Sequence, residues 1–249
     1  MSRADAFSAG SFEIDRIVTE KRMPPIDAIE SEQVSIIEIF KHLSHGADDF
    51  ERYPNPHAAR IAAISDQIGR SFNLGGRDRF SLRIAALAHD LGEVVMDRDY
   101  LSRAGSLSED ERIDLARHPL LGEREAAGAG ADRGAQLLVR WHHEWWNGNG
   151  YPDGLRFEQI PLGARILRVA DAYASLTDAR PFREAYSERQ AREHLLEWAG
   201  LEFDPRVVRA LLALEPFKEL KGYGGEVEAP PDLPAIADEL MARLQALGS

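Results

Sequence analysis

Seven side chains that can bind a divalent metal ion occur where the sequence predicts helices with an apolar face. They are five histidines and two aspartates: His57, His89, Asp90, His118, His142, His143 and Asp171. His89 and Asp90 follow the apolar run IAALA, and Asp171 lies in the mostly apolar segment RILRVADAYASL. A buried imidazole or carboxylate costs several kcal/mol unless it is paired, hydrogen-bonded or bound to a metal. Each of the seven alone has an ordinary explanation as a hydrogen-bonded core residue, whereas one or two divalent ions would satisfy all of them at once.

The chain contains no cysteine. This excludes disulfides, iron–sulfur clusters and zinc sites built from thiolates. The remaining donor atoms are nitrogen and oxygen, a set that suits iron, manganese or zinc and argues against copper(I).

The elements that must position these side chains are predicted to be helices almost throughout. Helices are expected over 27–43, from Asn55-Pro56, after Gly75-Gly76, from Ser108 toward His118, over 135–142, and from Pro161, Ser187 and Asp204-Pro205. Glycine and proline predict a loop over 44–56, and Gly92 is expected to end the third helix. A short strand is predicted only near 12–18. The fold class expected is therefore all-α.

Charge and composition limit what such a protein can do. The 249 residues include 30 Lys and Arg against 42 Asp and Glu, a net charge of −12 at pH 7. That balance argues against binding a nucleic acid polymer, which needs a basic face. No segment has the length of a signal peptide core or of a membrane span, so we expect a cytoplasmic protein without a membrane partner.

Composition also divides the chain into three parts. We expect an N-terminal extension with one helix over 1–50, a helical core domain over 51–216, and a Gly/Pro linker with a short amphipathic helix over 217–249.

Several motifs, in order, resemble those of the HD-GYP group of HD-domain phosphohydrolases. They are His57-x-x-Arg60, His89-Asp90, His118, HHEWWNGNGYP at 142–152, VAD ending at Asp171, TDARPFR at 177–183 and LEFDP at 201–205. The similarity spans about residues 55–212. It implies an HD-domain helical bundle that encloses a dinuclear metal site.

The resemblance also implies how the ligands are shared. Four side chains would hold the first ion: His57, His89, Asp90 and Asp171. Asp90 would bridge to a second ion, held by three further histidines: His118, His142 and His143. Some family members bind a third ion through a glutamate one helical turn before the first histidine, but Tyr53 stands there, so two ions are expected. We expect iron or manganese, with zinc, cobalt and nickel as alternatives.

The activity that the resemblance implies is hydrolysis of cyclic di-GMP to pGpG, and further to GMP, by a hydroxide that bridges the metals. The catalytic residues would be Asp90, Arg180 and Arg183, of which the two arginines would also bind the substrate phosphates. Three residues of the glycine loop would flank the guanine: Gly150, Tyr151 and Pro152. Either arginine could instead form a surface ion pair with Asp178 or Glu184.

Some positions depart from the family pattern. Glu93 replaces a lysine that touches the substrate phosphate or an active-site water, Asn147 replaces an aspartate, and Ala174-Ser175 replace Asp-Ala. Two alternatives therefore stand beside the phosphodiesterase. One is a weakly active or inactive domain that serves as a nucleotide receptor or interaction module, with a homodimer or a signalling protein bound through the terminal helices. The other is a phosphohydrolase for another nucleotide or phosphate ester.

Overall fold

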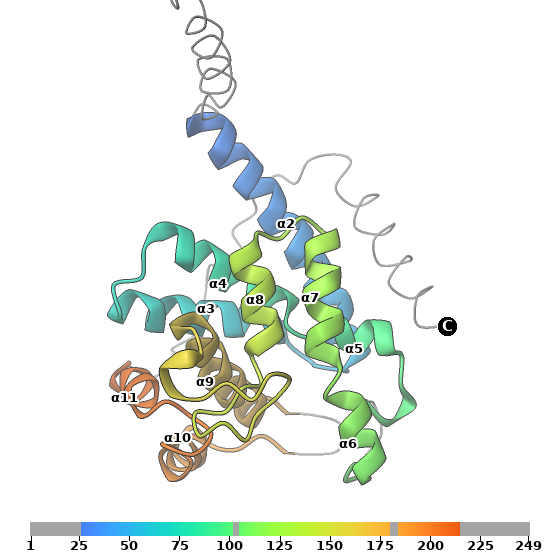
Figure 1. Ribbon diagram of the computed structural model, residues 1–249, viewed down its shortest axis with the longest axis vertical. Coiled ribbons are helices and arrows are strands. Elements are labelled where there is room, and N and C mark those ends of the chain that lie inside the picture. The colour runs from blue at the N-terminus through green and yellow to red at the C-terminus, as the bar shows by residue number, and fades with distance from the viewer. Residues whose placement is uncertain (1–25, 102–104, 180–183, 215–249) are drawn as a thin grey trace, which may run out of the picture. The chain divides into compact units, whose positions relative to one another are not determined.

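The computed structural model describes residues 26–101, 105–179 and 184–214. The chain divides into two compact units, Met1–Ser35 and Ile36–Ser249, and the account below concerns the described part of the second. That part consists of helices, turns and loops, with one isolated β-bridge between Ala199 and Phe203 (Figure 1). The all-α class expected from the sequence is confirmed.

Ten α-helices make up the described chain. They are α2 (Ile26–Phe50), α3 (His57–Ser71), α4 (Gly76–Ala88), α5 (Leu91–Met96), α6 (Glu109–Leu115), α7 (His118–Gly128), α8 (Arg133–Trp141), α9 (Leu162–Thr177), α10 (Glu188–Glu197) and α11 (Pro205–Ala213). Two short 3-10 turns, Asp99–Leu101 and Phe157–Gln159, lie in the connections.

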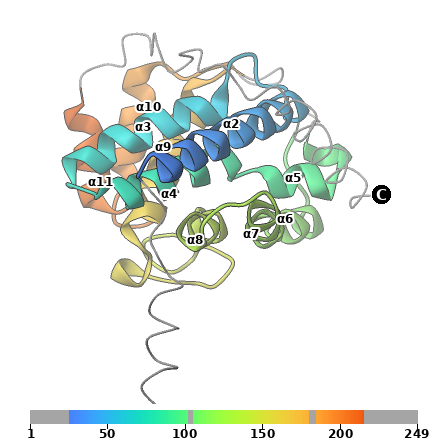
Figure 2. The same cartoon turned by 90° about the horizontal axis from the view of Figure 1, so that it is seen from above.

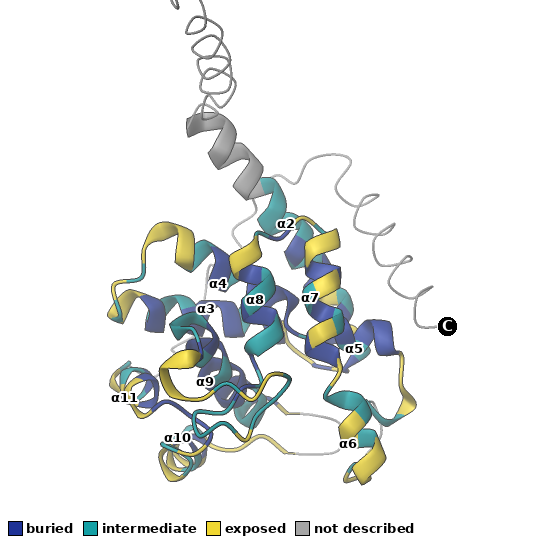
Figure 3. Ribbon diagram, in the orientation of Figure 1, coloured by how far each residue is buried: buried dark blue, intermediate teal, exposed yellow. Residues whose placement is uncertain are grey.

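Helix α9 is central to the packing. It contacts α3, α4, α8, α10 and α11, while α3 packs along α4 and α7 packs along α8 (Figure 2). The inner faces of α3, α4 and α9 are buried (Figure 3), and their largest side chains include Ile61, Ile84 and Leu167, none of which is exposed. Full burial of one such side chain stabilises the fold by about 1.5–3 kcal/mol. This core fixes the relative positions of the helix ends at which the candidate ligands lie.

Helix starts follow the capping residues that predict them. Ser108 and Ser187 each form a capping box with the residue three positions later, and the Asp204 carboxylate accepts a hydrogen bond from Arg206 N. Each cap satisfies amide donors that have no partner within the helix, and is typically worth about 1 kcal/mol. The helices predicted from these residues are confirmed.

Two predicted boundaries are wrong. Helix α2 does not stop at Leu43 but continues to Phe50, because Leu43 and Ala47 extend its buried face past Gly46. Helix α4 ends at Ala88, before His89, and Gly92 lies inside α5 and does not end a helix.

The predicted strand at 12–18 and the segment 217–249, including its amphipathic helix, lie outside the described residues. None of the described helices is both long enough and apolar enough to cross a bilayer.

Candidate metal centre

Each of the seven predicted ligands lies at a defined place in the helical framework. His57 and His118 are the first residues of α3 and α7, and Asp171 lies within α9. His89 and Asp90 occupy the break between α4 and α5, and His142 with His143 directly follows α8. The fold thus brings together residues that are separated by more than a hundred positions in the sequence.

The seven side chains form two clusters. One contains His57, His89 and Asp171, and the other contains Asp90, His118, His142 and His143; in each, one ligand atom per residue lies within 4.8 Å of the others. Asp90 lies between the clusters, with Oδ2 2.7 Å from His89 Nε2 and Oδ1 3.7 Å from His118 Nε2. Asp90 therefore contacts a histidine of each cluster, His89 of the first and His118 of the second.

Three of the histidines are oriented by the backbone. In each, the ring Nδ1 pairs with the carbonyl oxygen three residues earlier: His89 with Ala86 (3.0 Å), His118 with Leu115 (2.8 Å) and His142 with Val139 (2.6 Å). A carbonyl only accepts, so Nδ1 carries the proton. The Nε2 lone pairs of His118 and His142 are therefore available to a cation. Burial opposes protonation of His89, but Asp90 raises its pKa to about 10, so a metal would have to displace a proton from His89 Nε2.

His57 is held by side chains instead. Its Nδ1 donates to Asp178 Oδ2 at 2.7 Å, and Arg60 donates to the other oxygen of the same carboxylate. The Tyr53 ring stacks on the imidazole, with centroids 3.7 Å apart and planes at 8°. Both the position and the plane of His57 are thereby fixed.

The first cluster fits a metal ion. His57 Nε2 is buried and has no hydrogen-bond partner among the described residues, with Asp171 Oδ1 3.9 Å away, while His89 Nε2 faces Asp90 Oδ2 at 2.7 Å. Such buried atoms are costly unless a ligand satisfies them. Arg168 and Ser175 hold the two oxygens of Asp171, at 3.0 and 3.1 Å. The donor set, two imidazoles and an oriented carboxylate, is one that divalent transition metals accept.

The protonation states of the second cluster also suit a cation. Burial, reinforced by the neighbouring His118 and His89, lowers the pKa of His142 to about 3, and burial lowers the pKa of His118 and of His143 as well. Burial opposes ionisation of Asp90, but the surrounding histidines, His89 first, hold the pKa of its carboxyl well below its usual range. At neutral pH these imidazoles are neutral and the carboxylate is ionised, which are the forms that bind metals.

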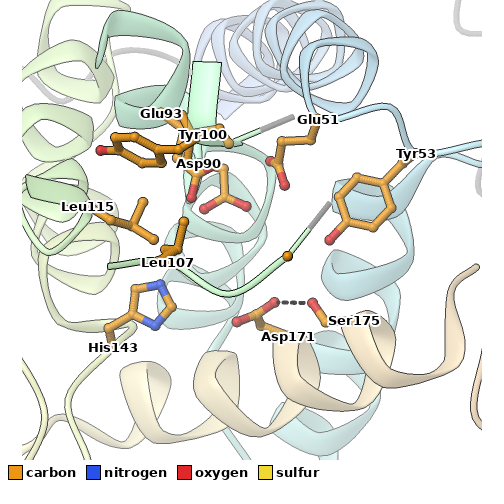
Figure 4. A pocket seen from close by; sticks show the side chains of 12 residues that line it. Glu51, Tyr53, Asp90, Glu93, Tyr100, Leu107, Leu115, His143, Asp171 and Ser175 are labelled. Carbon is orange, nitrogen blue, oxygen red and sulfur yellow. Dashed lines mark hydrogen bonds between the residues drawn. The ribbon is translucent and has the colours of Figure 1, made fainter. Parts of the chain in front are cut away.

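A cavity of about 250 Å³ opens beside the clusters. Its walls include the candidate ligands Asp90, His143 and Asp171, and also Glu51 and Glu93 (Figure 4). Burial, together with the negative charges of Glu51 and Asp90, raises the pKa of Glu93 well above its usual value. Glu93, which stands where the family pattern has a lysine, therefore adds a carboxyl group to the cavity wall beside the candidate ligands.

Two cavity residues have no role in the sequence-based prediction. Glu51 lies in the turn directly after α2, within the loop that the sequence predicts, but residue type and spacing do not predict its burial beside the ligands. Tyr100 lies in a 3-10 turn with no helical periodicity, and its hydroxyl donates to Asp114 at 3.0 Å, which places the ring at the cavity wall.

The glycine loop predicted to flank the substrate packs against the second cluster. Tyr151 stacks on His143 with centroids 4.9 Å apart, and the Tyr151–Pro152 peptide is cis. At Gly150 a β-carbon would lie 2.2 Å from Trp145 N, so only glycine fits the close approach of the chain. Arg180 and Arg183, the predicted phosphate-binding residues, lie outside the described residues.

The other departures have modest structural effects. Asn147 stabilises the loop, since its side-chain oxygen accepts from Asn149 N at 2.9 Å, and Ala174 is fully buried in α9. Ser175 contacts a candidate ligand directly through its bond to Asp171.

Comparisons with known proteins agree with this architecture. A family model described as HD domain matches residues 43–207, well over half of the chain. The cyclic di-GMP phosphodiesterase response regulator RpfG of Xanthomonas campestris pv. campestris is 37% identical over 156 residues, which cover 61% of this chain and 41% of that protein. The 3'3'-cGAMP-specific phosphodiesterase 2 of Vibrio cholerae is 27% identical over 178 residues, which cover 70% of this chain and 34% of that protein.

Among solved structures, the cyclic GMP-AMP specific phosphodiesterase V-cGAP3 of V. cholerae superposes with a TM-score of 0.66 at 20% identity, covering 86% of this chain and 60% of that one. This match supports the helical fold. The chain spans less than half the length of the two curated relatives. The chain belongs to the HD-domain family.

Proposed function

We propose that the chain is a metal-dependent phosphodiesterase that hydrolyses cyclic di-GMP to pGpG, and further to GMP. The observation that carries the proposal is the pair of ligand clusters with Asp90 between them. Relatives named as phosphodiesterases for cyclic di-GMP and for 3'3'-cGAMP support cyclic dinucleotides as the substrate class.

In this proposal two divalent ions, iron or manganese, occupy the clusters. His57, His89, Asp90 and Asp171 would hold the first, and Asp90, His118, His142 and His143 the second. When bound, such a pair supplies a water of lowered pKa as nucleophile and offsets the negative charge of the phosphoryl group. Zinc, cobalt and nickel remain alternatives because mixed imidazole and carboxylate sites accept several metals.

The side chains of this chain bind the metals and contact the substrate. The three histidines of the second cluster are neutral and Asp90 is ionised at neutral pH, so these four ligands are already in their binding forms, whereas His89 would release a proton when a metal binds. The cavity leads the scissile phosphate to this centre, and Tyr151 beside His143 marks where the guanine would lie. We assign Arg180 and Arg183 to the remaining phosphate oxygens, since guanidinium groups bind phosphate through paired hydrogen bonds.

The acidic wall of the cavity favours a second candidate function. Glu51 and Glu93 face the space that a dinucleotide phosphate would enter, and neither offers that phosphate a positive charge. A weakly active or inactive domain that serves as a nucleotide receptor or interaction module fits this feature. A homodimer or a signalling partner that binds through the terminal helices stays a prediction, since 215–249 lie outside the described residues.

The test is to load the purified chain with iron or manganese, measure its metal content, and follow cyclic di-GMP and 3'3'-cGAMP by chromatography. Linear products from the wild type, and none from Asp90→Asn, would support the phosphodiesterase. Full metal occupancy without turnover of either dinucleotide would reject it, and nucleotide binding under those conditions would favour the receptor.

A further inference from the structure

His57 differs from the other candidate ligands in what orients its ring. His89, His118 and His142 each pair Nδ1 with a backbone carbonyl three residues earlier, whereas His57 Nδ1 pairs with the carboxylate of Asp178. Asp178 is 121 positions away in the sequence and is buried.

The local backbone explains this difference. His57 and His118 both begin a helix, but the preceding residues have different conformations. Arg117 is helical (φ −88°, ψ −18°), which keeps the carbonyl of Leu115 close to the His118 ring. Pro56 has ψ 87°, so the chain leaves the helix direction before α3 and the equivalent carbonyl is not in reach. His57 therefore needs an acceptor from elsewhere in the fold.

Asp178 is itself fixed on two sides. Its second carboxylate oxygen accepts from Arg60, one helical turn after His57 on α3. Its backbone nitrogen donates to Ala174 O, so that Asp178 caps the C-terminal end of α9. Arg60 also lies over the Tyr173 ring of α9, 5.8 Å from its centroid. Asp178 thus ties α3, which supplies His57, to α9, which supplies Asp171.

We infer that Asp178 is a positioning residue for the first metal ion, which it serves by fixing the tautomer and ring plane of His57 and by joining the two helices that carry His57 and Asp171. The inference rests on the proposed metal centre but not on the identity of the nucleotide. Removal of a carboxylate that hydrogen-bonds a metal-binding histidine commonly weakens metal affinity by about 10–100-fold. Asp178 makes no contact with the second cluster among the contacts of the described residues, so its effect should be confined to one ion.

The experiment measures binding of Mn²⁺ alone to the metal-free full chain, with free Mn²⁺ followed by electron paramagnetic resonance. The wild type should bind two ions, and Asp178→Asn should lose about 10–100-fold in affinity for one of them and keep the other. Asp178→Glu, which restores the carboxylate, should recover part of the loss. The matched control is Asp66→Asn, since Asp66 lies in α3, accepts hydrogen bonds from Arg70 and Arg79, and has no histidine among the partners that the described residues show; the variant should bind both ions as the wild type does.

A second readout follows the ring itself. In the Co²⁺-loaded protein, the exchangeable Nδ1–H signals of bound histidines are shifted away from the other resonances, and Asp178→Asn should move or broaden one of them, that of His57. Wild-type affinity for both ions in Asp178→Asn would overturn the inference, as would an equal loss at both sites or an unchanged set of histidine signals. Because no nucleotide is present, failure here is distinct from failure of the proposed phosphodiesterase, which is judged by turnover.

Discussion

Gly92 of α5 packs so closely on α7 that a β-carbon at residue 92 would lie 2.0 Å from the carbonyl oxygen of His118. The contact joins the helix that follows Asp90 to the helix that begins with His118, so it sets the distance between two ligands of the second cluster.

Gly92→Ala should therefore lower both stability and metal binding. Relief of the clash requires α5 and α7 to separate, and overpacking of this kind costs about 1–3 kcal/mol, occasionally more. Urea unfolding of the metal-free protein measures the first effect, and metal content measures the second. The control is Gly76→Ala, where a β-carbon meets nothing within 4 Å; it should be neutral or stabilising by about 0.4–1 kcal/mol. Equal stability and equal metal content in Gly92→Ala and Gly76→Ala would show that the close contact at Gly92 does not set the spacing of α5 and α7.

Glu93 should limit turnover because a carboxyl stands where a cation could attract the substrate phosphate. Glu93→Lys places a positive charge at the cavity wall, so the KM for cyclic di-GMP should fall and kcat/KM should rise by about 10-fold or more, an effect that weakens with added salt. Glu158→Lys makes the same change in net charge at an exposed position away from the cavity and should leave kcat/KM within about 2-fold of the wild type. Unchanged or reduced kcat/KM in Glu93→Lys would show that Glu93 does not oppose the substrate.

Stability of the metal-free protein should be greatest near neutral pH. As the pH falls from 6.5 toward 3, the unfolded chain binds a proton at His142 that the folded chain does not, so the free energy of unfolding falls. As the pH rises from 6.5 toward 10, the folded chain keeps a proton at His89 that the unfolded chain has released, and the free energy of unfolding falls again. Within its own pH range, each of these two histidines changes the free energy of unfolding by on the order of 1 kcal/mol per pH unit.

Urea unfolding in the presence of a chelator, followed by tryptophan fluorescence from pH 4 to pH 10, measures this profile. His142→Gln should reduce the slope on the acidic side and leave the alkaline side, whereas His89→Gln should do the reverse. Variants that leave both slopes intact would show that other groups govern the pH dependence.

Much of the fold was predictable because the residues that begin its helices act on the backbone close to them in the sequence. The caps at Ser108, Ser187 and Asp204 act within one turn of the helices that they begin, and the structure has those helices. The break at His89 and Asp90 was not predictable from local spacing, since apolar residues continue across it into α5.

The candidate ligands could be recognised from residue type and order, but their surroundings could not. Asp178 reaches His57 from 121 residues away, and Glu51 lines the cavity from the turn that follows α2. Contacts between distant segments depend on how helices pack, which the spacing of residues within one segment does not specify.

The central claim is that Asp90 bridges two cations. The most direct test is the number of metal ions per chain in freshly purified wild type and Asp90→Asn, determined by elemental analysis. Asp97→Asn, at an exposed residue directly after α5, is the control. We expect two ions in the wild type and in Asp97→Asn, and a clear loss in Asp90→Asn together with loss of hydrolysis. Two ions retained in Asp90→Asn would contradict the bridging role and the account of the site built on it.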